Sequence, residues 1–573
     1  MKTRKALLMA TLACHASVTL VLAQPLDPRL DRKAGAALAS FTSSNLPIVV
    51  IDTHGQQILD EPKITADMGI IYNGPGVRNY LTDPFNHYNN KIGIEIRGAS
   101  SQMFPKKQFG IETRDAQGED LDVALLGLPE ESDWILSASY SDKTLMRNVL
   151  AYKLANDLGY YASRTRYCEV VLNGDYHGVY MLMEKVKRDK NRVNVAKMNA
   201  TDIAGDAVTG GYIFKIDKLA GSSTQGWNSA HLPYPGAWQQ IFYQYDYPDQ
   251  DEIVPEQKAY LQNYVAAFEG LMARPDYADP QNGYSRWLDV DSFVDYFILQ
   301  EIARNVDGYR LSAFMHKDRD SKNPKLKMGP LWDFDLAFGN ADYYDGAKIA
   351  GWQVDFQVQS DAFPLPFWWQ KLMQDSNFVN ALKARWEQLR KEVITVPRLN
   401  AYIDSVANYI DEAQARNFQR WPILGTYVWP NAYIGQSYSD ELDYFKNWLQ
   451  MRIAWMDARM PERGGTGTAK HAQAFPRAFT LAQNFPNPIH AKEGESFDNP
   501  STTIAFHLER SAFVSLKIFN VSGQEITALV EGELPAGDHE RSFFLNTLAS
   551  GVYFYRLQVG DGAASKKLLV IGR

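Results

Sequence analysis

A short stretch of flexible composition constrains the architecture of this 573-residue chain most strongly. Residues 461–468 read Pro-Glu-Arg-Gly-Gly-Thr-Gly-Thr, which is typical of a linker because such residues bring few apolar side chains to a core. The stretch follows an aromatic, helix-like segment over residues 441–460. We therefore expect a large body over residues 46–460, a linker over residues 461–477 and a C-terminal domain over residues 478–573.

The composition indicates a chain that folds and does not bind nucleic acid. Hydrophobic residues make up 45% of the sequence, which is enough for a substantial core. The formal net charge of −8 lacks the basic excess that nucleic-acid binders carry.

The first residues are typical of a secretory signal peptide over residues 1–23. A positively charged start precedes an apolar stretch over residues 6–22, and small residues offer a cleavage site before Gln24. A membrane anchor is the alternative, but His15 and Ser17 interrupt a stretch already near the minimum of about 20 residues. We expect no transmembrane segment after cleavage. Only Cys168 would then remain, in an apolar run, so we expect a buried thiol and no intramolecular disulfide.

The C-terminal part carries apolar runs of strand length separated by Ser-Gly and Ala-Gly turns, which predicts an all-β, immunoglobulin-like sandwich. The runs are residues 502–508, 514–519, 541–545, 552–559 and 567–571. This part also resembles the C-terminal sorting domain of type IX secretion cargo, on residues 481–488 (Leu-Ala-Gln-Asn-Phe-Pro-Asn-Pro), 501–504, 523–524, 548–553 and 566–568. The resemblance implies recognition by the type IX secretion machinery and a secreted or outer-surface location. A carbohydrate-binding sandwich is the alternative.

The large body changes character along its length. Residues 46–217 are rich in strand-like runs, interrupted by one helix over residues 143–158, whereas helical spacing dominates residues 256–460. We therefore predict an α+β, two-lobed domain with a cleft between a strand-rich and a helical lobe. The strongest helical patterns cover residues 261–272, 292–304, 378–393 and 399–416.

Three aspartates are expected to converge in that cleft. Asp291 is the expected N-cap of a helix that ends near residue 305, and Asp307-Gly308 then forms a loop before a strand over residues 311–316. A returning strand over residues 325–332 ends at Asp333 and Asp335. Antiparallel pairing brings the start of one strand beside the end of the other. Phosphoryl transfer requires such a set, with one carboxylate at the acceptor hydroxyl and others holding a divalent metal. The simpler alternative is that these aspartates only cap turns.

Five blocks stand in order within residues 46–460: Ile94–Ser101, Pro105–Phe109, Asp142–Asn148, Gly178–Val186 and Gly329–Gly339. Together they resemble the CotH family of spore-coat-type protein kinases. The resemblance implies an atypical, kinase-like fold that phosphorylates protein hydroxyls with ATP and Mg²⁺. It also implies that Asp307 is the catalytic aspartate and that Trp332-Asp333-Phe334-Asp335 is the metal-binding segment, with the main ligand left open between the two aspartates.

Further residues are candidates for contacts with the phosphates and with the adenine of ATP. Alternation along a strand predicts that Lys107 faces the cleft while Lys106 faces away, although an exposed strand lysine is the alternative. Arg97 and Arg147 are candidates for pairing with phosphate, or for anchoring the fold. By analogy with kinases, the neighbourhood of Glu184 is expected to meet adenine.

The kinase analogy is incomplete in two places. Ser312 stands where ordinary kinases place a metal-binding asparagine, so metal binding would lean on the two aspartates of the Asp-Phe-Asp segment. No glycine-rich loop of the usual type occurs, and Arg97-Gly98-Ala99-Ser100-Ser101 is expected to cover the phosphates instead.

Two other functions remain open from the sequence. ATP is scarce outside cells, so the body could be an inactive surface binding protein that uses Trp368, Trp369, Trp421 and Trp448; core packing is the alternative role of these tryptophans. It could also transfer AMP to protein. The sequence shows no histidine-rich metal pattern and no Gly-x-Ser-x-Gly motif, which disfavours a zinc hydrolase and a serine hydrolase.

Overall fold

The computed structural model forms two compact units, residues 1–465 and 466–573. It describes residues 41–219, 225–358 and 361–460 of the first unit. Of the second it describes residues 479–482, 484, 487, 489–490, 501–508, 510–520, 525–544, 550–559 and 562–571. The predicted signal peptide, the linker and parts of the sorting-domain motifs lie outside the described residues.

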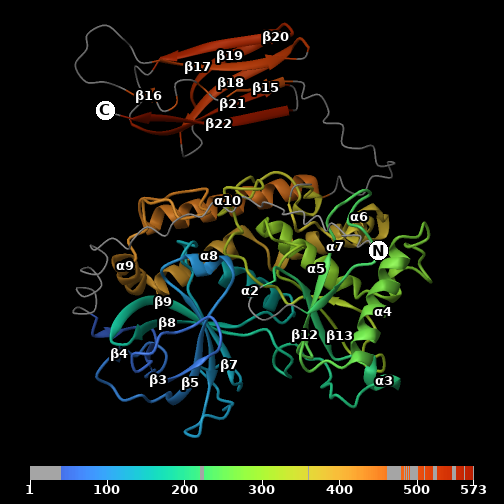
Figure 1. The fold of residues 1–573 in the computed structure, drawn as a ribbon. Helices are drawn as coiled ribbons and strands as arrows, with labels where there is room; N and C mark the ends of the chain where they lie inside the picture. Colours follow the sequence, from blue (N-terminus) through green and yellow to red (C-terminus); the bar gives the residue numbers. More distant parts are fainter. Residues whose placement is uncertain are drawn as a thin grey trace, which may run out of the picture. The chain divides into compact units, whose positions relative to one another are not determined.

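The first unit begins with a closed barrel (Figure 1). Only the pair β2 and β8 is parallel, and the other neighbouring strands run antiparallel. Alternating side chains such as Ile92, Ile94 and Phe109 fill its interior, together with Cys168, which is buried as predicted. In barrel order the strands are β2 (Ile48–Asp52), β3 (Ile64–Ile71), β5 (Tyr88–Arg97), β6 (Gln108–Thr113), β7 (Asp133–Ser137), β9 (Asp175–Glu184) and β8 (Thr165–Leu172).

A second, antiparallel sheet follows in the order β11 (Gly226–Asn228), β12 (Phe242–Tyr247), β10 (Tyr212–Ile216), β13 (Ala313–Lys317) and β14 (Lys327–Met328). The boundary therefore differs from the prediction, because β10 was expected in the strand-rich part and pairs instead with β12 and β13. The hairpin of β13 and β14 forms, with Met315 opposite Met328. Its second strand is short because Gly329-Pro330 follows it, and proline has no N–H for the ladder.

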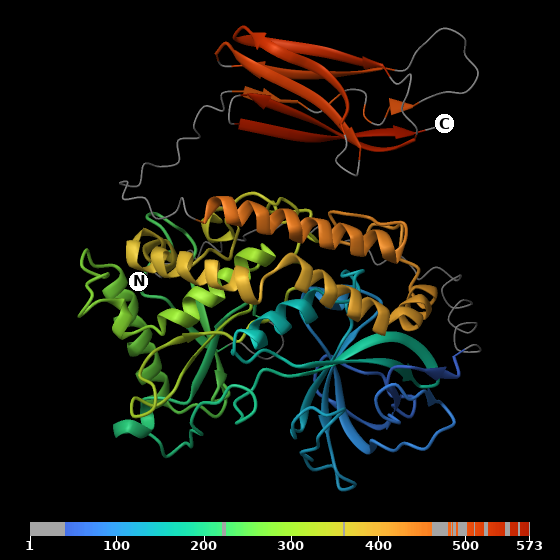
Figure 2. The same cartoon turned by 180° about the vertical axis from the view of Figure 1, so that it is seen from behind.

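Helices pack along one end of the barrel and the second sheet (Figures 1 and 2). The predicted helix over residues 399–416 is in fact two helices, α8 and α9, that meet at Ile410. No helix of the described residues has the length and apolarity that crossing a bilayer requires. The helices are α2 (Arg147–Asp157), α3 (Gly205–Val208), α4 (Pro255–Met272), α5 (Val290–Ala303), α6 (Phe367–Gln374), α7 (Ser376–Glu392), α8 (Val396–Tyr409), α9 (Asp411–Arg420) and α10 (Tyr438–Arg459).

Helix α5 leads to the predicted aspartate loop, and its cap differs from the expectation. The carboxylate of Asp289, not that of Asp291, accepts a hydrogen bond from the backbone N–H of Ser292. Asp291 lies in the first turn, where a negative charge favours the helix dipole. The helix ends at Ala303 because Arg304 adopts a left-handed conformation, with φ of 41°.

The second unit is all-β, as predicted. Two sheets share one core that includes Phe506, Leu516 and Leu568. One sheet has the order β15 (Phe479–Leu481), β17 (Ser501–Leu508) and β20 (Gly537–Phe544), and the other β16 (Ile489–His490), β22 (Gly562–Ile571), β21 (Gly551–Val559), β18 (Ala512–Asn520) and β19 (Glu525–Leu534). The sequence did not predict β19, because Glu531 and Glu533 interrupt its apolar run.

Candidate functional site

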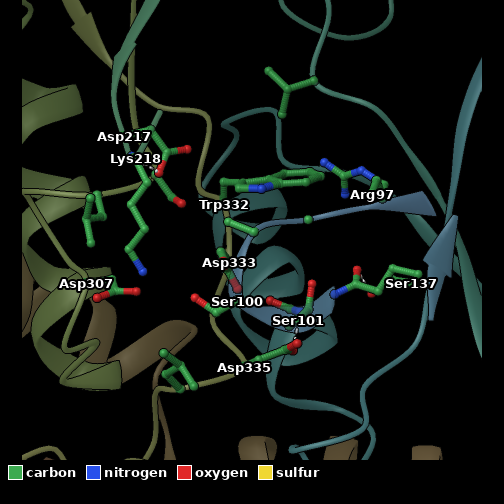
Figure 3. Close-up of a pocket in the computed structure, with 18 of the residues that line it drawn as sticks. Arg97, Ser100, Ser101, Ser137, Asp217, Lys218, Asp307, Trp332, Asp333 and Asp335 are labelled. Atoms are coloured by element: carbon green, nitrogen blue, oxygen red, sulfur yellow. Dashed lines mark hydrogen bonds between the residues drawn. The ribbon is translucent and has the colours of Figure 1, made fainter. Parts of the chain in front are cut away.

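A pocket of about 340 Å³ lies between the barrel and the second sheet. The barrel side supplies Arg97, Ser137 and the whole segment of residues 97–101 that was expected to cover phosphates. Strands β10 and β12 and the loop after β10 supply polar side chains that the sequence did not single out. These are Lys215, Asp217, Lys218, Gln244 and Asp246. Figure 3 shows this mixed lining of acids, bases and hydroxyls.

The three predicted aspartates all line this pocket. Asp307 lies in the loop after α5, and Asp333 and Asp335 follow β14. The side chain of Asn305 bridges the two loops, because its Oδ1 accepts from the N–H of Asp307 at 3.2 Å and its Nδ2 donates to the carbonyl of Asp333 at 3.1 Å. Asp333 has φ of 60°, a conformation that few residues other than glycine adopt. The β13–β14 hairpin therefore brings Asp307, which precedes it, near Asp333 and Asp335, which follow it.

Asp307 is buried beside a guanidinium. Burial raises the pKa of its carboxyl, and the positive charges of Arg310 and then Lys218 oppose that rise. Arg310 Nη2 lies 3.4 Å from Asp307 Oδ1, and Arg310 Nη1 lies 3.0 Å from Oδ1 of Asp361. Arg310 therefore helps to keep Asp307 ionised, as a proton acceptor must be.

The two aspartates after β14 line the pocket and repel neighbouring acids; the Asp333 side chain is exposed and that of Asp335 is half-buried. Desolvation within the pocket, followed by the charges of Asp307 and Asp217, raises the pKa of Asp333 to about 6. Desolvation and the charges of Asp333 and Asp142 raise the pKa of Asp335 well above its ordinary value. A bound cation would relieve this repulsion, so the acids fit a cationic ligand.

The donor set fits Mg²⁺ that is completed by phosphate. Among the described residues, no group of three or more His, Cys, Asp or Glu side chains is placed to hold a metal ion. Mg²⁺ usually takes only one or two carboxylates and fills its shell with water and phosphate oxygens. Asp333 and Asp335 can supply these carboxylates, and Ser312, whose φ is 50°, lines the same pocket.

The predicted cations divide between the pocket and other places. Arg97 lines the pocket, with its guanidinium 5.4 Å from the centre of the Trp332 ring. Lys107 does not line it, and its ammonium donates to the carbonyl of Gln102. The prediction for Lys107 was wrong because Phe109 and Ile111, the residues in phase with it, point into the barrel core, whereas Gln108 of the opposite phase lines the pocket. Lys106 does not line the pocket either, and its ammonium donates to the carbonyl of Val179.

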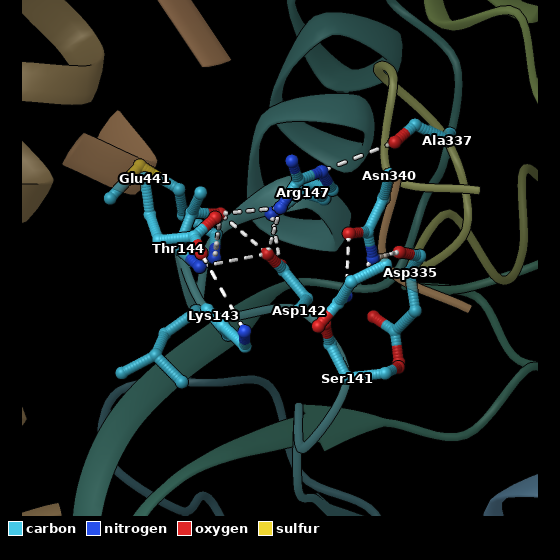
Figure 4. Close-up of polar contacts among 12 residues, drawn as sticks. Ser141, Asp142, Lys143, Thr144, Arg147, Asp335, Ala337, Asn340 and Glu441 are labelled. Carbon is cyan, nitrogen blue, oxygen red and sulfur yellow. Dashed lines mark hydrogen bonds and ion pairs between the residues drawn. The ribbon is translucent and has the colours of Figure 1, made fainter. Parts of the chain in front are cut away.

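Arg147 and Glu184 both lie outside the pocket lining and hold the fold. The Arg147 guanidinium contacts Asp142 Oδ1 at 2.5 Å and donates to the carbonyl of Ala337 at 3.1 Å (Figure 4). Glu184 is fully buried and accepts two hydrogen bonds from the guanidinium of Arg164, at 2.6 and 2.9 Å. Its neighbours Met183, Lys185 and Val186 do line the pocket, so an adenine site in this neighbourhood stays a prediction.

Sequence reasoning missed several residues of the site. Lys215 lies on β10 and Asp217 directly follows that strand, and both line the pocket, but a two-residue alternation gives no functional signal in the sequence. In the sequence, Asn148 is distinguished only as the last residue of the block Asp142–Asn148. Its side chain donates to Asp335 and accepts from the backbone N–H of Phe334 at 2.7 Å.

Comparisons with known proteins agree with both resemblances. The model of the family described as CotH kinase protein matches residues 94–456, and that of the secretion system C-terminal sorting domain matches residues 496–571. A comparison with curated proteins gave no match. The sorting domain directs type IX secretion, so the protein reaches the cell surface or the outside of the cell. The family match extends over more than half of the chain, which therefore belongs to the CotH kinase family.

Proposed function

We propose that this exported protein is an ATP-dependent protein kinase with a kinase-like, two-lobed catalytic unit and an immunoglobulin-like sorting domain. The observation that carries the proposal is the convergence of Asp307 with Asp333 and Asp335 in one pocket. The family match supports it independently.

Each acid has a distinct role in the proposed reaction. The acceptor hydroxyl oxygen forms a bond to the γ-phosphorus of ATP, the bond from that phosphorus to the β,γ-bridging oxygen breaks, and ADP leaves with the electron pair. Asp307 accepts the hydroxyl proton, and Arg310 holds the Asp307 carboxylate in place. Asp333 and Asp335, with the Ser312 hydroxyl, would hold Mg²⁺, which neutralises phosphate charge.

Transfer from labelled ATP tests the proposal. The chain beginning at Gln24 is incubated with γ-labelled ATP, Mg²⁺ and casein as a protein acceptor. Asp307→Asn keeps the shape of the side chain but removes the proton acceptor, so we expect transfer to fall at least about 100-fold. Asp251→Asn changes an exposed aspartate away from the pocket and serves as the control. Equal transfer by Asp307→Asn and Asp251→Asn would reject the role of Asp307.

Two alternatives are separated by simple observations. The tryptophans considered for a binding surface, Trp368, Trp369, Trp421 and Trp448, are all buried, which leaves the adhesin alternative without its main sequence argument. Transfer of AMP instead of a phosphoryl group would use the same acids, and the intact mass of the modified acceptor distinguishes the two products.

A further inference from the structure

Lys218 is a pocket cation that the sequence did not point to. It follows β10 and Asp217, and its side chain extends into the pocket toward Asp307 (Figure 3). Within the part of the chain that the structure describes, no carboxylate oxygen lies within 4.0 Å of its ammonium. The charge therefore has room beside it for a further anionic group.

Lys218 shares the pocket with the predicted proton acceptor Asp307 and with the predicted metal-binding aspartates. Its ammonium points toward the Asp307 carboxylate (Figure 3), and its positive charge opposes the raised pKa of Asp307, second only to that of Arg310. A phosphoryl group that is transferred to a hydroxyl at Asp307 must therefore come close to this ammonium.

The other cations of this region are already engaged. Lys215 Nζ lies 3.1 Å from Oδ1 of Asp246, Arg310 pairs with Asp361, and Arg97 lies over the ring of Trp332. Lysine is a compact point charge on a flexible stem, and it can follow a phosphoryl group as it moves.

We propose that Lys218 binds the terminal phosphate of ATP and stabilises the charge on its oxygens during transfer. This inference rests on the proposed kinase function. It assigns to the loop after β10 the phosphate-neutralising role that the sequence suggested for Lys107. It also orients the nucleotide, with its terminal phosphate toward the Asp307 side of the pocket.

Binding of a nucleotide series tests this role separately from catalysis. Lys218→Met, Lys218→Arg and wild type are titrated with ATP, ADP and adenosine in the presence of Mg²⁺, by calorimetry. Because a charge-assisted contact contributes about 1.5–3 kcal/mol, we expect Lys218→Met to weaken ATP binding by about 10-fold or more. ADP binding should weaken much less, and adenosine binding should not change. Lys218→Arg should recover part of the ATP affinity, since it keeps the charge.

Transfer assays and a control complete the design. Lys218→Met should lower kcat by about 100-fold, as removal of other groups that stabilise transition-state charge does, while exposed Lys190→Met should leave both ATP binding and kcat unchanged. Equal loss of ATP, ADP and adenosine binding, or wild-type binding and transfer by Lys218→Met, would overturn the role of Lys218. If wild type binds ATP without transferring phosphate, the kinase proposal fails, and the nucleotide series still decides whether Lys218 contacts the terminal phosphate. A wild-type chain that binds no nucleotide overturns both.

Discussion

Asn148 Nδ2 donates a hydrogen bond to Oδ1 of Asp335 across 2.5 Å, from helix α2 to the segment after β14. The Oδ1 atom of the same asparagine accepts from the backbone N–H of Phe334 at 2.7 Å. One amide side chain therefore fixes both the carboxylate and the backbone of the predicted metal-binding segment. Asn340 adds a hydrogen bond to the carbonyl of Asp335 at 2.7 Å.

Asn148→Ala should impair metal use more than it impairs folding. The change leaves a buried backbone N–H without its acceptor and frees the Asp335 carboxylate, so we expect a loss of about 1–3 kcal/mol in unfolding free energy. In transfer assays, the Mg²⁺ concentration for half-maximal rate should rise. A purely structural role would lower stability and leave that concentration unchanged. Asn408→Ala, at an exposed position on α8, is the control.

Asp335→Asn should make the protein more stable and less active. The Asp335 carboxylate is half-buried, and desolvation together with the charges of Asp333 and Asp142 raises its pKa, so neutralising it removes a repulsion while its oxygen still accepts from Asn148. We expect the unfolding free energy to rise by about 1 kcal/mol and Mg²⁺-dependent nucleotide binding to weaken. Both can be measured by thermal denaturation and titration.

Asp375, an aspartate that is buried, provides the contrast to Asp335. Asp375 caps α7 by accepting from the N–H of Asn377, and it also accepts from the Tyr284 hydroxyl. Asp375→Asn weakens these charge-assisted bonds, so it should lower the melting temperature. If Asp335→Asn also lowers the melting temperature, the Asp335 carboxylate stabilises the folded state, which would contradict the prediction.

The sequence predicted the acidic set because its members are linked by local structure. Asp307 and Asp333 lie at the two ends of one hairpin, and antiparallel pairing alone brings such ends together. Lys218 and Asn148 reach the same pocket from β10 and α2, through contacts between elements far apart in the chain. A single sequence carries no signal for those contacts.

The prediction that Lys107 faces the cleft failed for a different reason. Period-two alternation predicts which residues of a strand share a face, but not which face lies at the pocket. The face of Phe109 and Ile111 is the barrel core, and Gln108 on the other face lines the pocket. The neighbouring Lys106 is 2% exposed and donates to Asn417 Oδ1 at 2.9 Å, a helix residue that no local pattern links to it.

The buried ammonium of Lys106 should make stability depend on pH. Burial lowers the pKa of Lys106 to about 7, from an ordinary value of 10.5. Below pH 7 both states carry the proton and the cost of burying the charge is fully present. Between pH 7 and 10.5 the unfolded chain binds more protons than the folded chain, so this group makes stability rise with pH, by up to about 1.4 kcal/mol per unit.

Lys106→Met should remove that slope. Denaturant titrations at about pH 6 and about pH 9 should show the stability of the variant relative to wild type decreasing as the pH rises. The comparison concerns the slope alone, because the variant also leaves the carbonyl of Val179 and the side chain of Asn417 without the ammonium. Exposed Lys190→Met should follow wild type at both pH values. A pH-independent difference between Lys106→Met and wild type would contradict the prediction.

Removal of the second unit should abolish export and leave nucleotide binding by the first unit unchanged. Among the described residues, the core of the second unit, which includes Phe479 and Val570, contains none from the first unit, and the cores of the first unit contain none from the second. A chain that ends at residue 465 should therefore keep its melting temperature to within about 2 °C and bind ATP like the full chain. In cells with type IX secretion the shortened chain should remain inside, because the sorting domain is gone. Unfolding of the shortened chain at a much lower temperature would show that the second unit stabilises the first, and its appearance outside the cells would show a route of export that does not use the sorting domain.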